Sequence, residues 1–486
     1  MGVPQESQRR WCRRAIQGRL VAKGYNQVPG IDYDEMFAPV AKFTSIRAIL
    51  SLAAELDLEI MQLDVKSAFL NGELDSDEVI YMDIPEGIEG HSDELCMLIK
   101  ALYGLKQASR KWYEKLCKVV QELGVERIQS DFSIFVRIRA VPSSNMRELL
   151  IYLVYVDDTF VLSNSTVASQ ELKDHLGKHF EITELGELRY CLGIGMRRDR
   201  KHRTIHLSQS NFILQILEKY GMTNCKPVAT PMDVSVKMTK STDDDDDLAD
   251  QTLYQQILGS LMYLAIATRP DIAAAISTLS QFASRPNQTH YQALKRLLRY
   301  LRGTSNYELT LGRQSQDNHE RNDVRLPLEL TGYSDASWGN DHDTRRSYSG
   351  YVFLLGDSPI SWSSKRQSTV ALSTTEAEYI ALTQACKEAM WLRQLLSELS
   401  FDQSMTATTI YEDNQSTIAL AKNPVYHARS KHIDIQHHYI REKVQSQEIT
   451  LEYITTDDMI ADIFTKPLPG PRHGDLAKRL SLKVMS

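Results

Sequence analysis

The chain has 486 residues, of which 42% are hydrophobic and 24% charged, and its formal net charge is −7 at pH 7. At about 150 residues per domain this length predicts two or three compact units, and the composition excludes a wholly disordered chain, a collagen and a coiled coil. The negative net charge excludes a general polycation, so any nucleic-acid binding must use local basic surfaces.

Cysteine spacing and hydropathy predict the cellular compartment of the protein. The six cysteines lie far apart without a CxxC pair, which is typical of a reducing compartment rather than of a disulfide framework. The longest apolar run, residues 149–156, is far shorter than the ~20 residues that span a bilayer, and the first residues contain no apolar signal region. We therefore expect a soluble intracellular protein that does not contact a membrane.

Two elements with clear patterns come early in the chain. The apolar spacing over residues 43–55 predicts a helix, and residues 58–65 predict a buried strand that ends near Asp64. Residues 149–162 are rich in β-branched and aromatic side chains and predict a hairpin with residues 155–158 at its tip.

The middle of the chain is marked by an acidic run at residues 243–247. We expect a solvated linker there, because like charges repel one another; an acidic contact site is the alternative. Residues 253–301 predict helices, and Lys295, Arg299 and Arg302 share one helical face. A solvated face is the favoured interpretation, and a face that follows phosphates is the alternative.

A final unit begins near residue 328 and alternates strands with helices, which predicts an α/β domain. Its first strand ends at Asp335, a long helix follows Ser373, and a further strand ends at Asp413. A last strand and helix follow near residues 449–465.

Acidic residues interrupt the apolar strands. Asp157 and Asp158 lie side by side in the apolar hairpin, where burial without a partner is costly. A divalent cation removes this cost, and Asp64 can join the same site if the two strands are neighbours. Three such aspartates can hold two Mg²⁺ ions ~3.5–4 Å apart, which suits attack by a hydroxyl and departure of pyrophosphate.

The final unit repeats this pattern with Asp335, Asp413 and Asp462. Residues 373–376 form a capping box that begins a helix, and Glu378 lies on the apolar stripe of this helix. A salt-bridged glutamate in the first turn is the alternative interpretation. The four carboxylates predict a second two-metal site, suited to hydrolysis of a phosphodiester.

Ten sequence motifs carry a family resemblance. They are RLVAKGYNQ (19–27), FAPVAKFTSIR (37–47), LDVKSAFLNGEL (63–74), LYGLKQASRKWY (102–113), YVDD (155–158) and, in the final unit, GYSDASWG, RRSYSGYVFLLG, ISWSSKRQSTVALSTTEAEYIAL, KHIDIQHHYIRE and ADIFTKPLP. With this ordered set the chain resembles the C-terminal half of a copia-type LTR-retrotransposon polyprotein, from about residue 19 to about residue 469.

The resemblance implies an α+β right-hand polymerase with fingers, palm and thumb, followed by an α/β ribonuclease H-like domain. It implies N-terminally truncated fingers and the palm at 1–205, and a thumb and connecting helices at 206–325 with an acidic linker at 241–250. The ribonuclease H-like domain is expected at 326–470, and 471–486 are expected to form a tail.

The resemblance also implies roles for single residues. The palm metal ligands are Asp64, Asp157 and Asp158. The ribonuclease H carboxylates, also metal ligands, are Asp335, Glu378, Asp413 and Asp462, with Glu376 the competing choice for Glu378. The nucleotide-binding residues are Phe69 as a steric gate under the incoming sugar, Gln107 in the nucleotide pocket, and Arg19 and Lys23 at the triphosphate.

The implied function is RNA-directed DNA synthesis on retrotransposon RNA, with cleavage of the RNA strand of the hybrid. Each active site would use two Mg²⁺ ions, with Mn²⁺ as the alternative. The partners would be an RNA template, a DNA primer, the RNA–DNA hybrid and deoxynucleoside triphosphates, in cytoplasmic particles and in the nucleus. Two alternatives stay open because only 18 residues precede RLVAKGYNQ: a polymerase-inactive nucleic-acid-binding remnant, or a ribonuclease H only.

Overall fold

The computed structural model describes residues 20–76, 78–85, 94–141, 147–241, 248–313, 328–401, 403–404, 406–422 and 434–485. Arg19 and the acidic run at 243–247 lie outside these residues. The chain divides into two compact units, one formed by Met1–Pro39 and Val65–Glu122 and the other by Val40–Asp64 and Leu123–Ser486. The predicted domain boundaries stay a prediction.

The first unit is small. Its elements are η1 (Gly24–Asn26), η2 (Ala68–Asn71), the antiparallel pair β2 (Tyr81–Asp83) and β3 (Leu95–Met97), and α2 (Ala108–Gln121). Gly24 and Gly104 bring the first and fourth sequence motifs together, because a Cβ atom on Gly24 would lie 1.8 Å from the Gly104 carbonyl oxygen. The backbone of Ala22 also donates a hydrogen bond to Tyr103. Glycine at both positions permits this approach.

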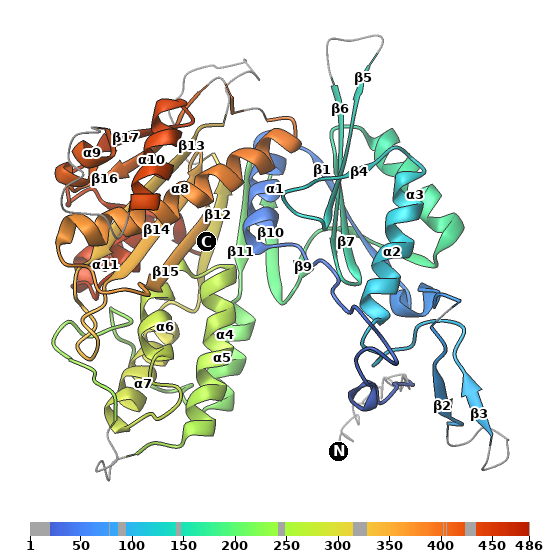
Figure 1. Ribbon diagram of the computed structural model, residues 1–486, viewed down its shortest axis with the longest axis horizontal. Coiled ribbons are helices and arrows are strands. Elements are labelled where there is room, and N and C mark those ends of the chain that lie inside the picture. The colour runs from blue at the N-terminus through green and yellow to red at the C-terminus, as the bar shows by residue number, and fades with distance from the viewer. Residues whose placement is uncertain are drawn as a thin grey trace, which may run out of the picture. The chain divides into compact units, whose positions relative to one another are not determined.

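The second unit contains a six-stranded sheet in the order β4-β5-β6-β7-β1-β8 (Figure 1). Its strands are β1 (Glu59–Val65), β4 (Glu126–Arg127), β5 (Ile134–Ala140), β6 (Arg147–Tyr155), β7 (Asp158–Ser163) and β8 (Ile182–Glu187). The helices beside it are α1 (Phe43–Glu55) and α3 (Thr166–His179). The predicted helix over 43–55, the early strand and the hairpin are confirmed.

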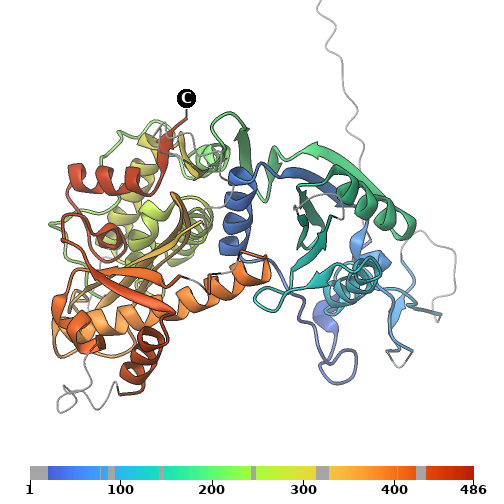
Figure 2. The same ribbon diagram turned by 90° about the horizontal axis from the view of Figure 1, so that it is seen from above.

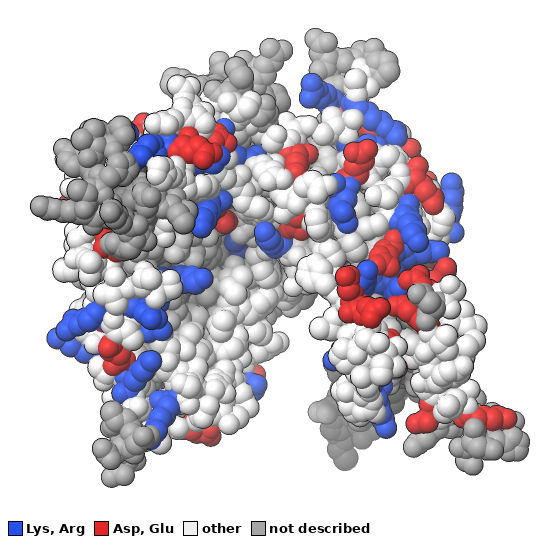
Figure 3. Space-filling model, in the orientation of Figure 1, with Lys and Arg blue, Asp and Glu red and all other residues white. Residues whose placement is uncertain are grey.

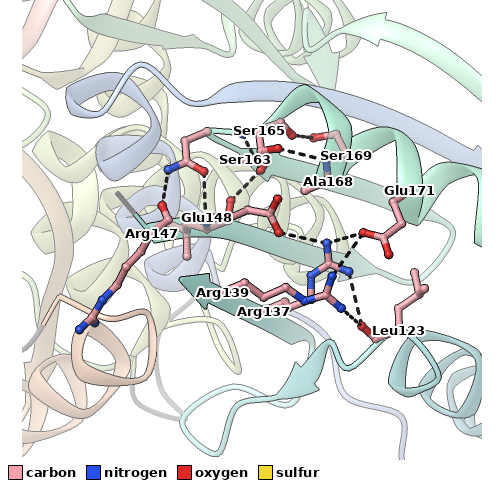
Figure 4. A network of polar contacts seen from close by, with 12 residues as sticks. Leu123, Arg137, Arg139, Arg147, Glu148, Ser163, Ser165, Ala168, Ser169 and Glu171 are labelled. Carbon is pink, nitrogen blue, oxygen red and sulfur yellow. Dashed lines mark hydrogen bonds and ion pairs between the residues drawn. The ribbon is translucent and has the colours of Figure 1, made fainter. Parts of the chain in front are cut away.

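A buried arginine fixes α3 on this sheet. Arg137 on β5 is 4% exposed and pairs with Glu148 on β6 at 3.3 Å and with Glu171 on α3 at 2.7 Å (Figure 4). It also donates to the Leu123 carbonyl oxygen. A buried charge requires such partners, so the network locks β5, β6 and α3 together.

A second sheet of five strands has the order β18-β12-β11-β10-β9. Its strands are β9 (Tyr190–Cys191), β10 (Ile194–Asp199), β11 (Thr204–Ser208), β12 (Tyr307–Gly312) and β18 (Leu482–Val484). Two differences from the sequence-based expectation appear here. The segment expected to be thumb and connecting helices also contributes strand β12, and the expected tail forms α11 (Gly470–Arg479) and β18, because Leu476 and Leu480 are buried and β18 pairs with β12.

The helices between β11 and β12 share one apolar core. They are α4 (Ser210–Lys219), α5 (Gln251–Ala267), η3 (Pro270–Ile272), α6 (Ala273–Ser280) and α7 (Gln288–Gly303). On α7, Arg299 and Arg302 donate to the carbonyl oxygens of Lys226 and Thr223 at 2.7 and 2.8 Å. Two of the three predicted basic residues therefore bind the chain's own backbone, while Lys295 lies over the ring of Tyr291.

The last part of the second unit forms the predicted α/β domain, called the final domain below. Its sheet has the order β15-β14-β13-β16-β17, with β16 parallel to both of its neighbours. The strands are β13 (Leu330–Ser337), β14 (Tyr348–Leu355), β15 (Ser358–Arg366), β16 (Thr408–Glu412) and β17 (Ile449–Tyr453). The helices are α8 (Thr374–Glu398), α9 (Gln415–Lys422), α10 (Asp434–Gln445) and η6 (Ile460–Phe464).

Helix α1 joins the six-stranded sheet to this final domain. Arg47 is 3% exposed, stacks on the Trp362 ring at 3.8 Å and donates to the Ile360 and Ala267 carbonyl oxygens. The C-terminal half of α8 lies beside α1 (Figure 2), where Trp391 receives Lys42 over its ring. In the described part of the chain, no helix has the length and apolar character needed to cross a membrane.

Candidate active sites

Of the three predicted palm aspartates, Asp64 and Asp158 lie on the neighbouring strands β1 and β7, and Asp157 lies in the turn that precedes β7. β1 and β7 are antiparallel, and their register pairs Asp64 with Asp158. Asp158 also pairs with Tyr155 across the β6–β7 turn, which consists of Val156 and Asp157. The strand neighbourhood on which the predicted site depends is therefore present.

The tip of this hairpin has an unusual backbone. Val156 has φ of 59°, a left-handed conformation that is unfavourable for a β-branched residue. Hairpin turns that need a positive φ usually place glycine there. Strain of this kind costs ~1–3 kcal/mol and collects at functional sites, where the surrounding structure enforces it.

The charge at this edge suits a cation. Burial and the neighbouring Asp64 carboxylate raise the pKa of Asp158, and a hydrogen bond from Gln62 opposes them. A divalent ion bound by carboxylate oxygens would remove this repulsion, and oxygen ligands are those that Mg²⁺ prefers. Burial and the charge of Asp158 also raise the pKa of the nearby Cys191 thiol.

The described nucleotide-binding candidates belong to the first unit. Gln107 is fully buried, where it donates to the Asp32 carbonyl oxygen at 3.0 Å and accepts from Gln27 at 3.1 Å. Phe69 is partly buried with its ring centroid 5.0 Å from that of Tyr103, and Lys23 is exposed. Their roles stay predictions.

Three carboxylates of the final domain converge. Asp335 on β13, Glu378 on α8 and Asp413 just after β16 each offer an oxygen, and these oxygens lie within 4.8 Å of one another. β13 and β16 are parallel neighbours, so their C-terminal ends meet at one sheet edge, and α8 begins there. Among the described residues, the palm aspartates form no such close group of ligand oxygens.

Glu378 rather than Glu376 belongs to this cluster. Ser373 caps α8 by accepting a hydrogen bond from the Glu376 backbone, and the Glu376 side chain accepts from the Leu372 backbone at 2.8 Å. The predicted capping box thus begins the helix, although its return bond reaches Leu372 instead of Ser373. Glu376 supports the helix start, and Glu378, one half-turn on, faces the carboxylates.

The negative charge of the converging carboxylates is only partly balanced, by Lys466. Burial and nearby acidic groups raise the pKa of Asp335 to about 6 against the opposing effect of Lys466. Burial, Asp335 and other carboxylates raise the pKa of Glu378 well above its usual range. Within the described residues, the buried Oε2 of Glu378 has no hydrogen-bond partner. A divalent cation fits this oxygen-only group, because it would supply both the charge and the missing partner.

Asp462 is held differently. It lies in η6 and binds Lys466 at 2.6 Å and Arg472 at 3.5 Å. Lys466 also lies 3.9 Å from Asp335, and Thr465 donates a hydrogen bond to the Asp335 carboxylate. Asp462 therefore lies next to the cluster but is paired with cations in this structure.

Comparison with known proteins identifies the family. The profile described as reverse transcriptase (RNA-dependent DNA polymerase) matches residues 8–234. The Pol polyprotein of transposon TNT 1-94 from Nicotiana tabacum is 42% identical over 93% of this chain, and that of transposon RE1 from Arabidopsis thaliana is 42% identical over 96%. The putative transposon Ty5-1 protein of Saccharomyces cerevisiae is 32% identical over 67% of this chain and its own entire length.

The chain belongs to the copia-type retrotransposon Pol family. It spans about a third of the two plant polyproteins, 33% and 30% of their lengths. A solved foamy viral protease-reverse transcriptase in complex with double-stranded DNA has a TM-score of 0.47 and 13% identity, over 87% of this chain and 61% of that one.

In this copia-type Pol chain, one further carboxylate, Glu412, lies beside the cluster but was not among the predicted site residues. Glu412 is fully buried at the end of β16, and burial and the charges of Asp335 and Asp413 raise its pKa well above the usual range. Successive side chains of a strand point to opposite faces, so Thr408, Ile410 and Glu412 share one face, and this face is buried. This alternation could have identified Glu412 as a buried carboxylate.

Proposed function

We propose that this chain is an RNA-directed DNA polymerase that also cleaves the RNA strand of an RNA–DNA hybrid. The observation that carries the proposal is the register pair of Asp64 and Asp158 beside Asp157, in a chain of the copia-type Pol family. The carboxylate group of Asp335, Glu378 and Asp413 supports the second activity.

At the polymerase site, Asp64, Asp157 and Asp158 would hold divalent ions. Bound Mg²⁺ supplies charge that activates the primer hydroxyl and neutralises pyrophosphate. The strained backbone of Val156 directly precedes these two adjacent carboxylates. Gln107, Lys23 and Arg19 would bind the incoming deoxynucleotide, and Phe69 would exclude a ribose.

At the ribonuclease site, Asp335, Glu378 and Asp413 would hold the metal, and Asp462 would complete the ligand set. Lys466 holds the Asp462 carboxylate and lies near Asp335, so it limits repulsion between the two before a cation binds. Thr465 orients Asp335 through its hydrogen bond.

Two assays on the intact chain test this proposal. Extension of a fluorescent DNA primer on an RNA template and cleavage of a labelled RNA–DNA hybrid should both require Mg²⁺ and stop with EDTA. Hybrid cleavage without extension would favour the ribonuclease-only alternative, which the closer grouping of its carboxylates supports. Loss of both activities with retained RNA binding would favour the polymerase-inactive remnant.

A further inference from the structure

A cavity of about 640 Å³ lies beside the ribonuclease carboxylates. Helices α6 and α7, the extended segment 232–238 and the loop between β13 and β14 line it. Thr465, which donates a hydrogen bond to Asp335, also lines the cavity. One threonine therefore separates the cavity from the carboxylate cluster.

The outer wall of the cavity is fixed in place. Arg296 on α7 pairs with Asp233 at 2.9 Å and donates to the Thr230 hydroxyl at 2.9 Å. Further along the same segment, the Lys240 backbone donates to Asp343 at 2.9 Å. These contacts tie the segment to α7 at one end and to the β13–β14 loop at the other, so the cavity is preformed.

The lining combines apolar, amide and basic groups. Met232, Met238 and Phe282 provide apolar surface, and Gln288 and Gln292 provide amide donors and acceptors.

The charge of the lining is positive. Its two acids are already paired, Asp233 with Arg296 and Asp341 with Arg366. Lys237 is then an exposed cation of the lining. Figure 3 shows basic side chains gathered over α7 and the loops beside it, at the lower left of the view.

We propose that this cavity binds unpaired nucleotides of the RNA strand where that strand leaves the hybrid next to the ribonuclease site. Its volume lies within the ~300–1,000 Å³ typical of ligand sites. Apolar and amide surface for bases beside an exposed cation for a phosphate suits a segment of single-stranded nucleic acid. The inference rests on the proposed ribonuclease activity, since that activity brings the RNA strand to Asp335.

Cleavage of two hybrids by the intact chain tests the inference. One hybrid is blunt, and the other carries single-stranded RNA extensions at both ends. Lys237→Gln removes the cavity's exposed cation, and Thr289→Trp places a ring into the cavity from an exposed position on α7. The control for Lys237→Gln is Lys295→Gln on α7, and the control for Thr289→Trp is the exposed Gln256→Trp on α5; neither control residue lines the cavity.

Both cavity variants should raise KM for the extended hybrid by roughly fivefold or more and leave its kcat unchanged. KM and kcat for the blunt hybrid should not change, and both control variants should have the kinetic constants of the original chain. Equal effects on both hybrids, or none, would overturn the inference while leaving the ribonuclease assignment intact. If the original chain cleaves neither hybrid, the proposed function itself fails.

A second readout does not depend on cleavage. In EDTA, an extended hybrid with 4-thiouridine in its single-stranded RNA is photo-crosslinked and the modified peptides are identified by mass spectrometry. Crosslinks to segment 232–238 or to α7 are expected, and Thr289→Trp should reduce them. Crosslinks confined to other segments contradict the inference.

Discussion

The role proposed for each acidic side chain depends on which other carboxylates lie beside it. Glu378 and Glu376 lie one half-turn apart on α8, yet only Glu378 shares the group with Asp335 and Asp413. Glu376 instead accepts a backbone hydrogen bond at the helix start. Replacement by glutamine should therefore affect hybrid cleavage at Glu378 but not at Glu376.

Glu378→Gln should reduce hybrid cleavage at least a hundredfold, because it removes one charge from the proposed metal ligands. Glu376→Gln keeps an acceptor for the Leu372 backbone, so it should cost no more than ~1 kcal/mol of stability and leave cleavage largely intact. Cleavage rates and melting temperatures of both variants measure this. The reverse ranking would contradict the assignment of Glu378.

The buried acids also predict a pH dependence of stability. The folded state raises the pKa of Asp335 to about 6, so it binds this proton more tightly than the unfolded chain. The resulting stabilisation is complete below the unfolded pKa near 4 and is lost as pH rises through about 6.

In metal-free buffer, the free energy of unfolding should therefore fall between about pH 4 and 6, by up to roughly 3 kcal/mol for this group. Asp335→Asn should make this fall smaller, while Glu378 and Glu412, whose pKa values are also raised, keep part of it. Mg²⁺ should restore stability at pH 7 to the original chain but not to the variant. Denaturant unfolding across this pH range measures both. A profile that rises over the same range would contradict the account.

Phe69 has two interpretations that a variant separates. Its ring packs against Tyr103, which is consistent with a structural role as well as with the proposed gate. If it is a gate, Phe69→Val should admit ribonucleotides while deoxynucleotide addition persists. If it only packs, Phe69→Val and Tyr103→Val should both cost ~1–4 kcal/mol and reduce both additions equally. An unchanged ratio of ribo- to deoxynucleotide incorporation in Phe69→Val rejects the gate.

At the element scale, α1 connects the six-stranded sheet with the final domain. Arg47 is buried and satisfies carbonyl oxygens from β15 and from the C-terminal end of α5. Arg203 also donates to a carbonyl oxygen of α1, that of Glu55, but it is exposed.

Arg47→Met keeps an apolar stem against Trp362 and removes the hydrogen bonds, so it should destabilise the second unit by about 2–4 kcal/mol. Arg203→Met should cost less than about 0.5 kcal/mol, because water can replace an exposed donor. Denaturant unfolding of the two variants provides the comparison. Equal effects would mean that the Arg47 contacts do not hold these elements together.

Elements with strong local periodicity were predictable from the sequence. Helix α1 has the predicted bounds, and the hairpin of β6 and β7 has its predicted tip, because apolar spacing alone specifies them. Strands β12 and β18 were not predicted. They are short, and each is stabilised by a partner far away in the sequence, a contact that no local pattern reports.

The candidate sites divide in the same way. Asp157 and Asp158 were conspicuous as charges inside an apolar run, and the structure brings Asp64 to them through strand pairing. Glu412 was not predicted because the adjacent Asp413 was interpreted as the acidic residue at the strand end, although the alternation of side chains along the strand indicates that Glu412 is buried. The basic residues of α7 were ambiguous, since helical periodicity cannot tell water from a backbone carbonyl as the partner.

In the whole molecule, the two proposed metal sites are chemically independent of each other. One group lies at the β1–β7 strand pair of the six-stranded sheet and the other beside β13 and β16 of the final domain, and both lie within the second unit. Removing the charges at one site should therefore leave the other intact, although α1 connects the elements that carry them.

The most direct test combines Asp157→Asn and Asp158→Asn, which preserve size and remove the charges that would hold Mg²⁺. Asp174→Asn, exposed on α3, is the matched control. Primer extension and hybrid cleavage are measured on the same preparation, with a melting curve to establish folding. The account predicts that the double variant loses extension by at least a thousandfold and retains hybrid cleavage within about twofold. A folded double variant that loses both activities, or that still extends the primer, would contradict it.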